Sequence, residues 1–249
     1  MLEIFFGFLI ATAMGLTGVG GGTITTPLLI LVLRLPAAVA VGTALTFTAV
    51  TNMLLAPMYL LRRQVSFKTY GWMVLGGLPG VILGGLLLNH MAKSINHRPL
   101  YLILGCTIVF AAALNIFRLV RSGGKEHGAL RPRVLPFIMF PVGAEVGFSS
   151  AGSGALGSLA LLGFTSLTAA QVVGTDICFG LTMSVTGSGI QLMAGNYDAT
   201  VLVRLLIGGV FGAFTGSMLA VRIPSRPLKW ALAVWLAGLG VNLFVRGLS

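Results

Sequence analysis

The chain has 249 residues, of which 56% are hydrophobic and only 8% are charged, against roughly a quarter charged in an ordinary soluble domain. This composition excludes a water-soluble globule and predicts an all-α polytopic membrane protein. The net charge of +11 does not indicate nucleic-acid binding, because basic residues of membrane proteins collect in cytoplasmic loops and no basic run in the sequence is interleaved with aromatic residues.

Apolar stretches predict two kinds of helix along the chain. A helix that crosses a hydrocarbon core about 30 Å thick needs about 20 residues. Stretches of this length occupy residues 37–61, 69–89, 99–120, 168–194, 199–221 and 227–246. Shorter stretches occupy residues 2–14, 22–34, 134–147 and 153–164. Each of the shorter stretches has only about 12 to 14 residues, which is too few to cross the membrane as a helix.

A tract of small residues divides each pair of short stretches. The first tract is Gly15-Leu-Thr-Gly-Val-Gly-Gly-Gly22 and the second is Gly147-Phe-Ser-Ser-Ala-Gly-Ser-Gly154. The tracts are 132 residues apart, and this offset continues without a gap as far as Gly84 and Gly216. The sequence therefore predicts a first repeat at residues 1–121, a basic cytoplasmic linker at 122–133 and a second repeat at 134–249.

Glycines spaced by four recur in both copies. Gly76, Gly80 and Gly84 correspond to Gly208, Gly212 and Gly216. Small residues at this spacing let helix backbones approach closely, so we expect these positions to pack against other helices.

Charge placement predicts that the second copy is inverted relative to the first. If each short pair is re-entrant and is followed by three transmembrane helices, the loops near 62–68, 118–133 and 222–229 share one face. These loops carry most of the Lys and Arg residues, which makes their face cytoplasmic. Broken helices that cross once would instead make the halves parallel. The charge distribution favours the inverted arrangement, although the sequence alone does not decide between re-entrant and spanning pairs.

The two tracts are the candidate ligand site. Paired broken helices in inverted repeats are typical of secondary transporters, which bind substrate near the midplane. Helices that begin at Gly22 and near Gly154 would direct backbone N–H groups and positive dipole ends at a small anion, and we expect positive φ at Gly21. The alternative is that the small residues serve helix packing alone. The candidate substrate-binding residues are Thr17, Gly20, Gly21, Gly22, Thr23, Thr43, Ser149, Ser150, Gly152, Ser153, Gly154 and Thr175.

Two acidic residues inside predicted helices lie near the second tract or the Gly-Thr pair that follows it. Glu145 precedes the second tract and Asp176 follows Thr175. Because an intramembrane carboxylate is energetically costly, each residue is a candidate for coupling transport to protons, with a structural hydrogen bond as the alternative. Thr43 and Thr175 either donate to an anion or satisfy a backbone carbonyl. Since the sequence contains no Walker loop, metal-ligand cluster or nucleophile with its base, we expect no enzyme activity, cofactor or metal.

The first tract, followed by Pro27-Leu28-Leu29 and Ala40-Val-Gly-Thr-Ala-Leu45, resembles the signature of the sulfite exporter (TauE/SafE) family. The resemblance covers nearly the whole chain. It implies a multi-pass inner-membrane transporter that exports sulfite or a related sulfur anion. The second half departs from the family pattern at Ser150-Ala-Gly-Ser-Gly154 and at Leu159, which leaves the substrate open.

The resemblance and the residues together define the expected partners. They are a small inorganic or organic sulfur anion and membrane lipid, without nucleic acid. Alternative functions are a carrier or channel for an organosulfonate, thiosulfate or a carboxylate, and a membrane-embedded enzyme is the remaining, disfavoured class. The sequence leaves open the coupling ion and whether the chain forms a homo-oligomer.

Overall fold

The computed structural model describes residues 1–17, 21–93, 102–107, 109–110, 113, 132–151, 153–219 and 238. The elements with defined bounds in these residues are all helices. In the first half they are α1 (Leu2–Thr17), α2 (Gly22–Leu31), α3 (Ala37–Leu61) and α4 (Phe67–Ala92). In the second half they are the short 3₁₀ helix η1 (Pro132–Val134), α6 (Leu135–Ser149), α7 (Ser153–Phe164), α8 (Ala169–Met193) and α9 (Ala199–Leu219).

The helix bounds follow the apolar stretches of the sequence. The predicted helices at 37–61 and 153–164 are confirmed as α3 and α7 with the same ends. The two tracts separate α1 from α2 and α6 from α7, so the predicted interruptions are also confirmed. The expected helices at 99–120 and 227–246 lie outside the described residues apart from a few positions, as does most of the linker at 122–133.

Among the described helices, α3, α4 and α9 are long and apolar enough to cross a membrane. Helix α8 has 25 residues, as many as α3. It is not among these three candidates because Asp176, two glutamines and several serines and threonines lower its hydropathy. The length of α8 agrees with the sequence prediction, whereas its composition is that of a helix with polar neighbours.

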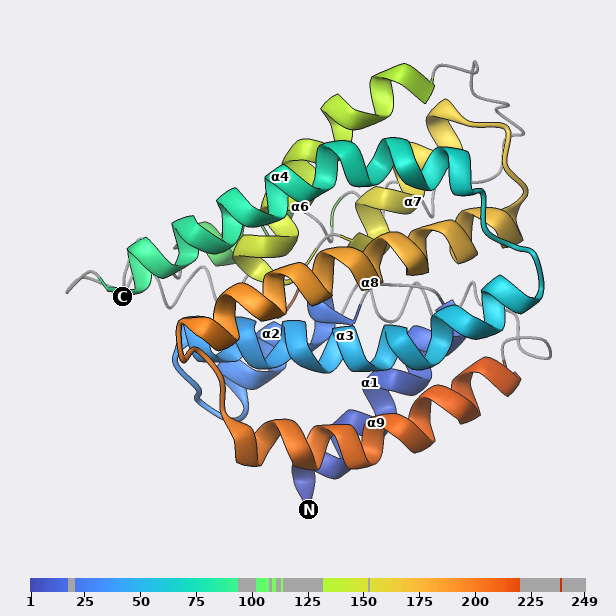
Figure 1. Ribbon diagram of the computed structural model, residues 1–249. Coiled ribbons are helices and arrows are strands. Elements are labelled where there is room, and N and C mark those ends of the chain that lie inside the picture. The colour runs from blue at the N-terminus through green and yellow to red at the C-terminus, as the bar shows by residue number, and fades with distance from the viewer. Residues whose placement is uncertain are drawn as a thin grey trace.

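The helices form three layers (Figure 1). Helices α3 and α8 lie side by side in the middle, α4 packs with α6 on one side, and α1 packs with α9 on the other. The turn from α3 to α4 and the turn from α8 to α9 lie at opposite ends of this arrangement (Figure 1). Each outer layer thus combines one helix from each half of the chain.

The glycine ladders make the contacts of the outer layers, as the sequence predicted. A Cβ on Gly76 would overlap the carbonyl oxygen of Pro136, and a Cβ on Gly208 would overlap that of Ile4. Further overlaps of this kind pair Gly80 with Phe140, Gly84 with Ala144, Gly212 with Phe8 and Gly216 with Thr12. Each of these ladder contacts in one layer therefore has a counterpart 132 residues away in the other, with the two halves exchanged.

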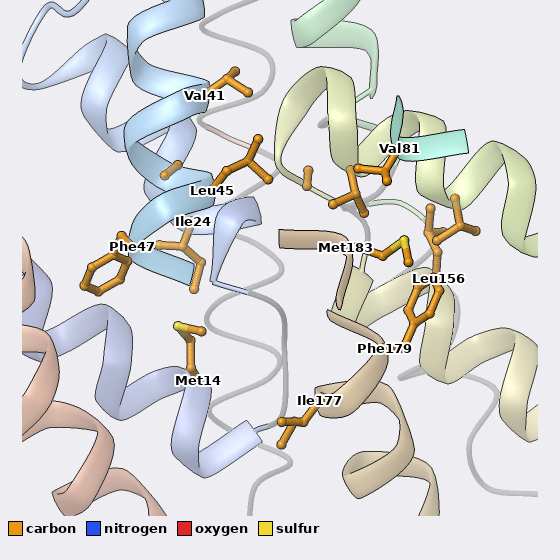
Figure 2. Close-up of a cluster of buried hydrophobic side chains, with 14 of the residues drawn as sticks. Met14, Ile24, Val41, Leu45, Phe47, Val81, Leu156, Ile177, Phe179 and Met183 are labelled. Atoms are coloured by element: carbon orange, nitrogen blue, oxygen red, sulfur yellow. The ribbon is translucent and has the colours of Figure 1, made fainter. Parts of the chain in front are cut away.

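The same exchange occurs in the hydrophobic core. Phe47 of α3 and Phe179 of α8 are both fully buried and lie on opposite sides of the cluster (Figure 2). The Phe47 ring lies against Gly209 of α9, and the Phe179 ring lies against Gly77 of α4. Each central phenylalanine thus fills the space left by a glycine of the other half.

Corresponding turns also have the same backbone geometry. The N–H of Gln64 donates to the Tyr59 carbonyl at 3.0 Å, and the N–H of Asn196 donates to the Gln191 carbonyl at 2.9 Å. Arg63 and Gly195, which lie inside these turns, both adopt positive φ, of 52° and 74°. The repeat predicted from the sequence is thus accompanied by matching backbone conformations at both long-helix turns.

The ladder contacts predict a position-dependent effect of the same substitution. Gly208→Ala should lower stability by about 1–3 kcal/mol, because the added methyl group meets the Ile4 backbone in a closely packed interface. Gly189→Ala is the matched control, since nothing lies within 4 Å of the position of its Cβ. Thermal unfolding in detergent measures both variants, and equal stability of the two would contradict the assigned helix contact.

Candidate functional site at the helix breaks

The two helix breaks meet in the structure. A Cβ on Gly22, the first residue of α2, would overlap both the carbonyl oxygen and the Oγ of Ser150. Ser150 directly follows α6, which also contacts α2. Two tracts that are 132 residues apart in the sequence are therefore in direct contact, and only a glycine at position 22 permits that contact.

The second break has an ordered backbone. Ser150 ends α6 in the left-handed region with φ of 62°, and its N–H donates to the Val146 carbonyl at 2.8 Å. The Ser149 hydroxyl donates to the Glu145 carbonyl at 3.0 Å and accepts from the Ala151 N–H at 3.1 Å. The Ser149 side chain thus stabilises the end of α6.

At the first break, the expectation of positive φ at Gly21 was wrong. Gly21 has φ of −60° and ψ of −31°, which any L-residue adopts. The glycine instead provides space, because a Cβ there would overlap the sulfur of Met14 and lie 3.2 Å from Oγ1 of Thr48. Among the described residues of the two breaks, Ser150 adopts positive φ, and its counterpart by sequence is Gly18, which lies outside the described residues.

The N-cap residue of α2 is Gly21, which has no side chain to cap the helix. The Gly21 carbonyl accepts from the N–H groups of Ile24 and Thr25, and the Thr25 hydroxyl also donates to it at 2.8 Å. The first N–H groups of a helix have no partner within the helix and carry its positive dipole end. This helix start can therefore bind an anion with backbone groups alone.

Three buried hydroxyls add donors near this helix start. Thr26, Thr48 and Ser150 are 0%, 3% and 2% exposed, and their hydroxyl oxygens have no hydrogen-bond partner among the described residues. Sequence reasoning selected Ser150 but missed Thr26 and Thr48. Thr26 could have been found, because it follows Gly22 by four residues and so shares its helix face. Thr48 has no such local signal, since its proximity to Gly21 depends on how α3 packs.

The structure does not bring Thr43 and Thr175 together. The Thr43 hydroxyl accepts from the backbone N–H of Asp198 at 3.0 Å, and the Thr175 hydroxyl accepts from the backbone N–H of Ser66 at 3.0 Å. Asp198 and Ser66 lie in the two turns at opposite ends of the molecule (Figure 1). Each threonine contacts a turn of the other half. In both bonds the hydroxyl accepts from a backbone N–H, whereas from the sequence we considered donation to a backbone carbonyl.

The two acidic side chains have different surroundings. Oδ2 of Asp176 accepts a hydrogen bond from the Ser158 hydroxyl at 2.6 Å, and Gly157 leaves room for its carboxylate. The counterparts of Ser158 and Asp176 in the first half are Thr26 and Ala44. The first half therefore keeps the hydroxyl without the carboxylate. Glu145 has a buried Oε1 with no hydrogen-bond partner in the described part of the chain.

The remaining predicted site residues are less informative. Thr23 and Gly154 are buried near the starts of α2 and α7. Thr17 and Ser153 lie at helix ends, but their side chains are not among the described parts of the structure. Gly20 and Gly152 lie outside the described residues.

Within the described residues, no three His, Cys, Asp or Glu side chains gather as a metal site would require.

Comparison with known proteins identifies the family. A family model described as "Sulfite exporter TauE/SafE" matches residues 3–243, which is nearly the whole chain.

The chain belongs to the TauE/SafE family.

Two curated relatives of this TauE/SafE member come from Bacillus subtilis (strain 168). "Probable membrane transporter protein YjnA" is 30% identical over 250 residues, which cover 96% of this chain and 98% of that protein. "Probable membrane transporter protein YdhB" is 25% identical over 237 residues, which cover 93% of this chain and 95% of that protein. No solved structure matches. The family and both names support a membrane transporter rather than an enzyme, and the resemblance seen in the sequence is confirmed.

The Asp176 environment predicts different effects at two corresponding hydroxyls. Ser158→Ala should lower stability by about 1–3 kcal/mol, because it removes a hydrogen bond from a buried carboxylate. Thr26→Val, at the corresponding position, should not lower it, since the Thr26 hydroxyl has no described partner. Unfolding of both variants in detergent tests the difference, and a larger loss for Thr26→Val would contradict it.

Proposed function

We propose that this TauE/SafE protein is a secondary transporter that exports sulfite or a related small sulfur oxyanion across the inner membrane. The observation that carries the proposal is the contact between Gly22 and Ser150, which unites the two helix breaks. Interrupted helices in transporters bind substrate where their ends converge, because unwound backbone within the membrane needs a polar partner. The proposed substrate site is therefore the junction of the two tracts.

The donors near this junction suit an oxyanion. The uncapped start of α2 offers backbone N–H groups, while Thr26, Thr48 and Ser150 offer hydroxyls. Oxygen atoms of a sulfur oxyanion accept hydrogen bonds from both kinds of donor. These groups carry no formal charge, so they can bind a small anion without holding it as tightly as a buried arginine would.

We further propose that the two halves are inverted repeats, at 1–121 and 134–249, joined by a cytoplasmic linker at 122–133. The support is the exchange of contacts, since reciprocal contacts between equivalent surfaces arise from a two-fold axis. The turn that contains Arg62 and Arg63 is basic, whereas its counterpart at 194–198 has no Lys or Arg. This charge difference favours opposite faces for the two turns, with the basic one in the cytoplasm.

The first test of the proposal is transport by reconstituted protein. Gly21→Val and Ser153→Val should abolish sulfite flux in proteoliposomes, because each adds bulk at the junction. Since the atoms nearest to a Cβ at position 21 are the end of the flexible Met14 side chain and the Thr48 hydroxyl, we expect the protein to remain folded. Gly189→Ala serves as the control that keeps flux.

Parallel assays with organosulfonate, thiosulfate and a carboxylate distinguish the alternative substrates. Unchanged flux in both junction variants would exclude the proposed site. Failure of the parent protein to carry any sulfur anion would exclude the proposed function.

Proton coupling through Glu145 or Asp176 is a separate part of the proposal. Glu145→Gln and Asp176→Asn should keep anion binding but flatten the response of flux to an imposed pH gradient, because an amide cannot take up and release the coupled proton. Sulfite and bisulfite interconvert near neutrality, so an organosulfonate of fixed charge is the better substrate for this assay. If both variants keep the parent's gradient response and thermal stability, the anion moves down its own gradient without proton coupling.

A further inference from the structure

The turn from α3 to α4 and the turn from α8 to α9 are each held by one threonine of the other half. Thr43 of α3 accepts the N–H of Asp198, and Thr175 of α8 accepts the N–H of Ser66, both at 3.0 Å. Both threonine side chains are fully buried. Since Thr43 and Thr175 are 132 residues apart, as are Ser66 and Asp198, the same bond occurs twice with the halves exchanged.

A glycine beside each threonine brings the turn close to the central helix. A Cβ on Gly42 would overlap the carbonyl oxygen of Asn196, and a Cβ on Gly174 would overlap that of Gln64. The Gly-Thr dipeptide thus provides two functions: the glycine permits contact with the turn, and the threonine then binds the backbone of that turn. Helix packing alone would require the glycine but not the hydroxyl.

The bonded residues also define the start of the next helix. Asp198 accepts from the Val201 N–H through Oδ1 at 2.9 Å and from the Leu202 N–H through its carbonyl at 2.9 Å. Ser66 is the N-cap residue of α4, and its carbonyl accepts from the Tyr70 N–H at 2.9 Å. Movement of either turn away from the central helix would therefore carry the first turn of α9 or α4 with it.

We propose that these two hydrogen bonds are the closing contacts of two gates, one at each end of the transporter. The bond from Asp198 to Thr43 closes the end at the turn from α8 to α9, and the bond from Ser66 to Thr175 closes the end at the turn from α3 to α4. Because the two bonds share no atom and lie at opposite ends, one can open while the other stays closed. The inference rests on the proposed transport function, whose substrate site would be reached alternately from the two ends.

Other side chains contribute to each closed end, so removal of one threonine should weaken a gate without abolishing it. Asn196 donates to Asn89 at 2.7 Å and to Gln191 at 2.9 Å, while Gln191 donates to the Gly85 carbonyl at 3.3 Å. At the other end, Tyr70 and Thr182 form a hydroxyl pair at 2.7 Å. Among these side-chain hydrogen bonds, those of Thr43 and Thr175 are the pair that occurs in the same form at both ends.

The test measures access to the junction from each face. A Thr48→Cys reporter is introduced after Cys106 and Cys178 are replaced by alanine, and a membrane-impermeant maleimide is applied to vesicles of each orientation. Thr43→Val leaves the Asp198 N–H without its acceptor in the closed state, which raises the free energy of that state relative to the open one. Labelling from one face should therefore increase by roughly two- to tenfold. Thr175→Val should produce the corresponding increase from the opposite face.

Matched variants separate gating from general loosening. Thr43→Ser and Thr175→Ser keep the acceptor and should label like the parent. Thr46→Val should favour neither face, because the Thr46 hydroxyl bonds Ser188 of the other central helix at 2.8 Å and the Gly42 carbonyl of its own helix at 2.9 Å. Increases from the same face for both valine variants, or no increase in either, would overturn the proposed gates.

The labelling result is independent of the substrate. Labelling from opposite faces together with absence of sulfur-anion flux would support the gates and refute the proposed substrate. Sulfite flux by the parent protein together with unchanged labelling in both valine variants would refute the gates and leave the transport proposal intact. The two failures are therefore distinguishable when flux is measured in vesicles of the parent protein and labelling in vesicles of the reporter variants.

Discussion

Close approach of helix backbones from opposite halves is the constraint on which the rest of the structure depends. Lipid tails are as apolar as leucine side chains, so association of membrane helices relies on van der Waals packing and hydrogen bonds rather than on burial from water. The glycines of α4 and α9 permit this packing against α6 and α1. The outer layers pack against α3 and α8 in the middle. In this arrangement the two helix breaks are in contact at Gly22 and Ser150.

Local sequence patterns predicted much of this arrangement because helices and their interruptions are local features. Apolar length predicted α3 and α7 with the observed ends, and the glycine spacing predicted the packing faces of α4 and α9. The partners of individual side chains could not be predicted in this way. Thr43 and Thr48 are close in sequence, but the first binds a turn and the second lies near Gly21, because their directions depend on the helices packed around α3.

The halves share a backbone plan but differ in polar chemistry. The Ser158 hydroxyl donates to Asp176, while the corresponding residues of the first half are Thr26 and Ala44, which has no carboxylate. The backbone conformation of Gly21 was also mispredicted: a glycine tract is the usual signal for positive φ, but Gly21 is helical, and the described tract residue with positive φ is Ser150. Repetition therefore predicts where helices bend and pack more reliably than which side chains are bound there.

The pairing of α1 with α9 has a consequence for biogenesis. These helices lie at Leu2–Thr17 and Ala199–Leu219, so α1 packs against a helix that leaves the ribosome much later. The face of α1 that contacts Gly208 and Gly212 lacks this partner until α9 is synthesised. Contacts of such long sequence separation form late, so the layer of α1 and α9 forms only after insertion of the second half of the chain.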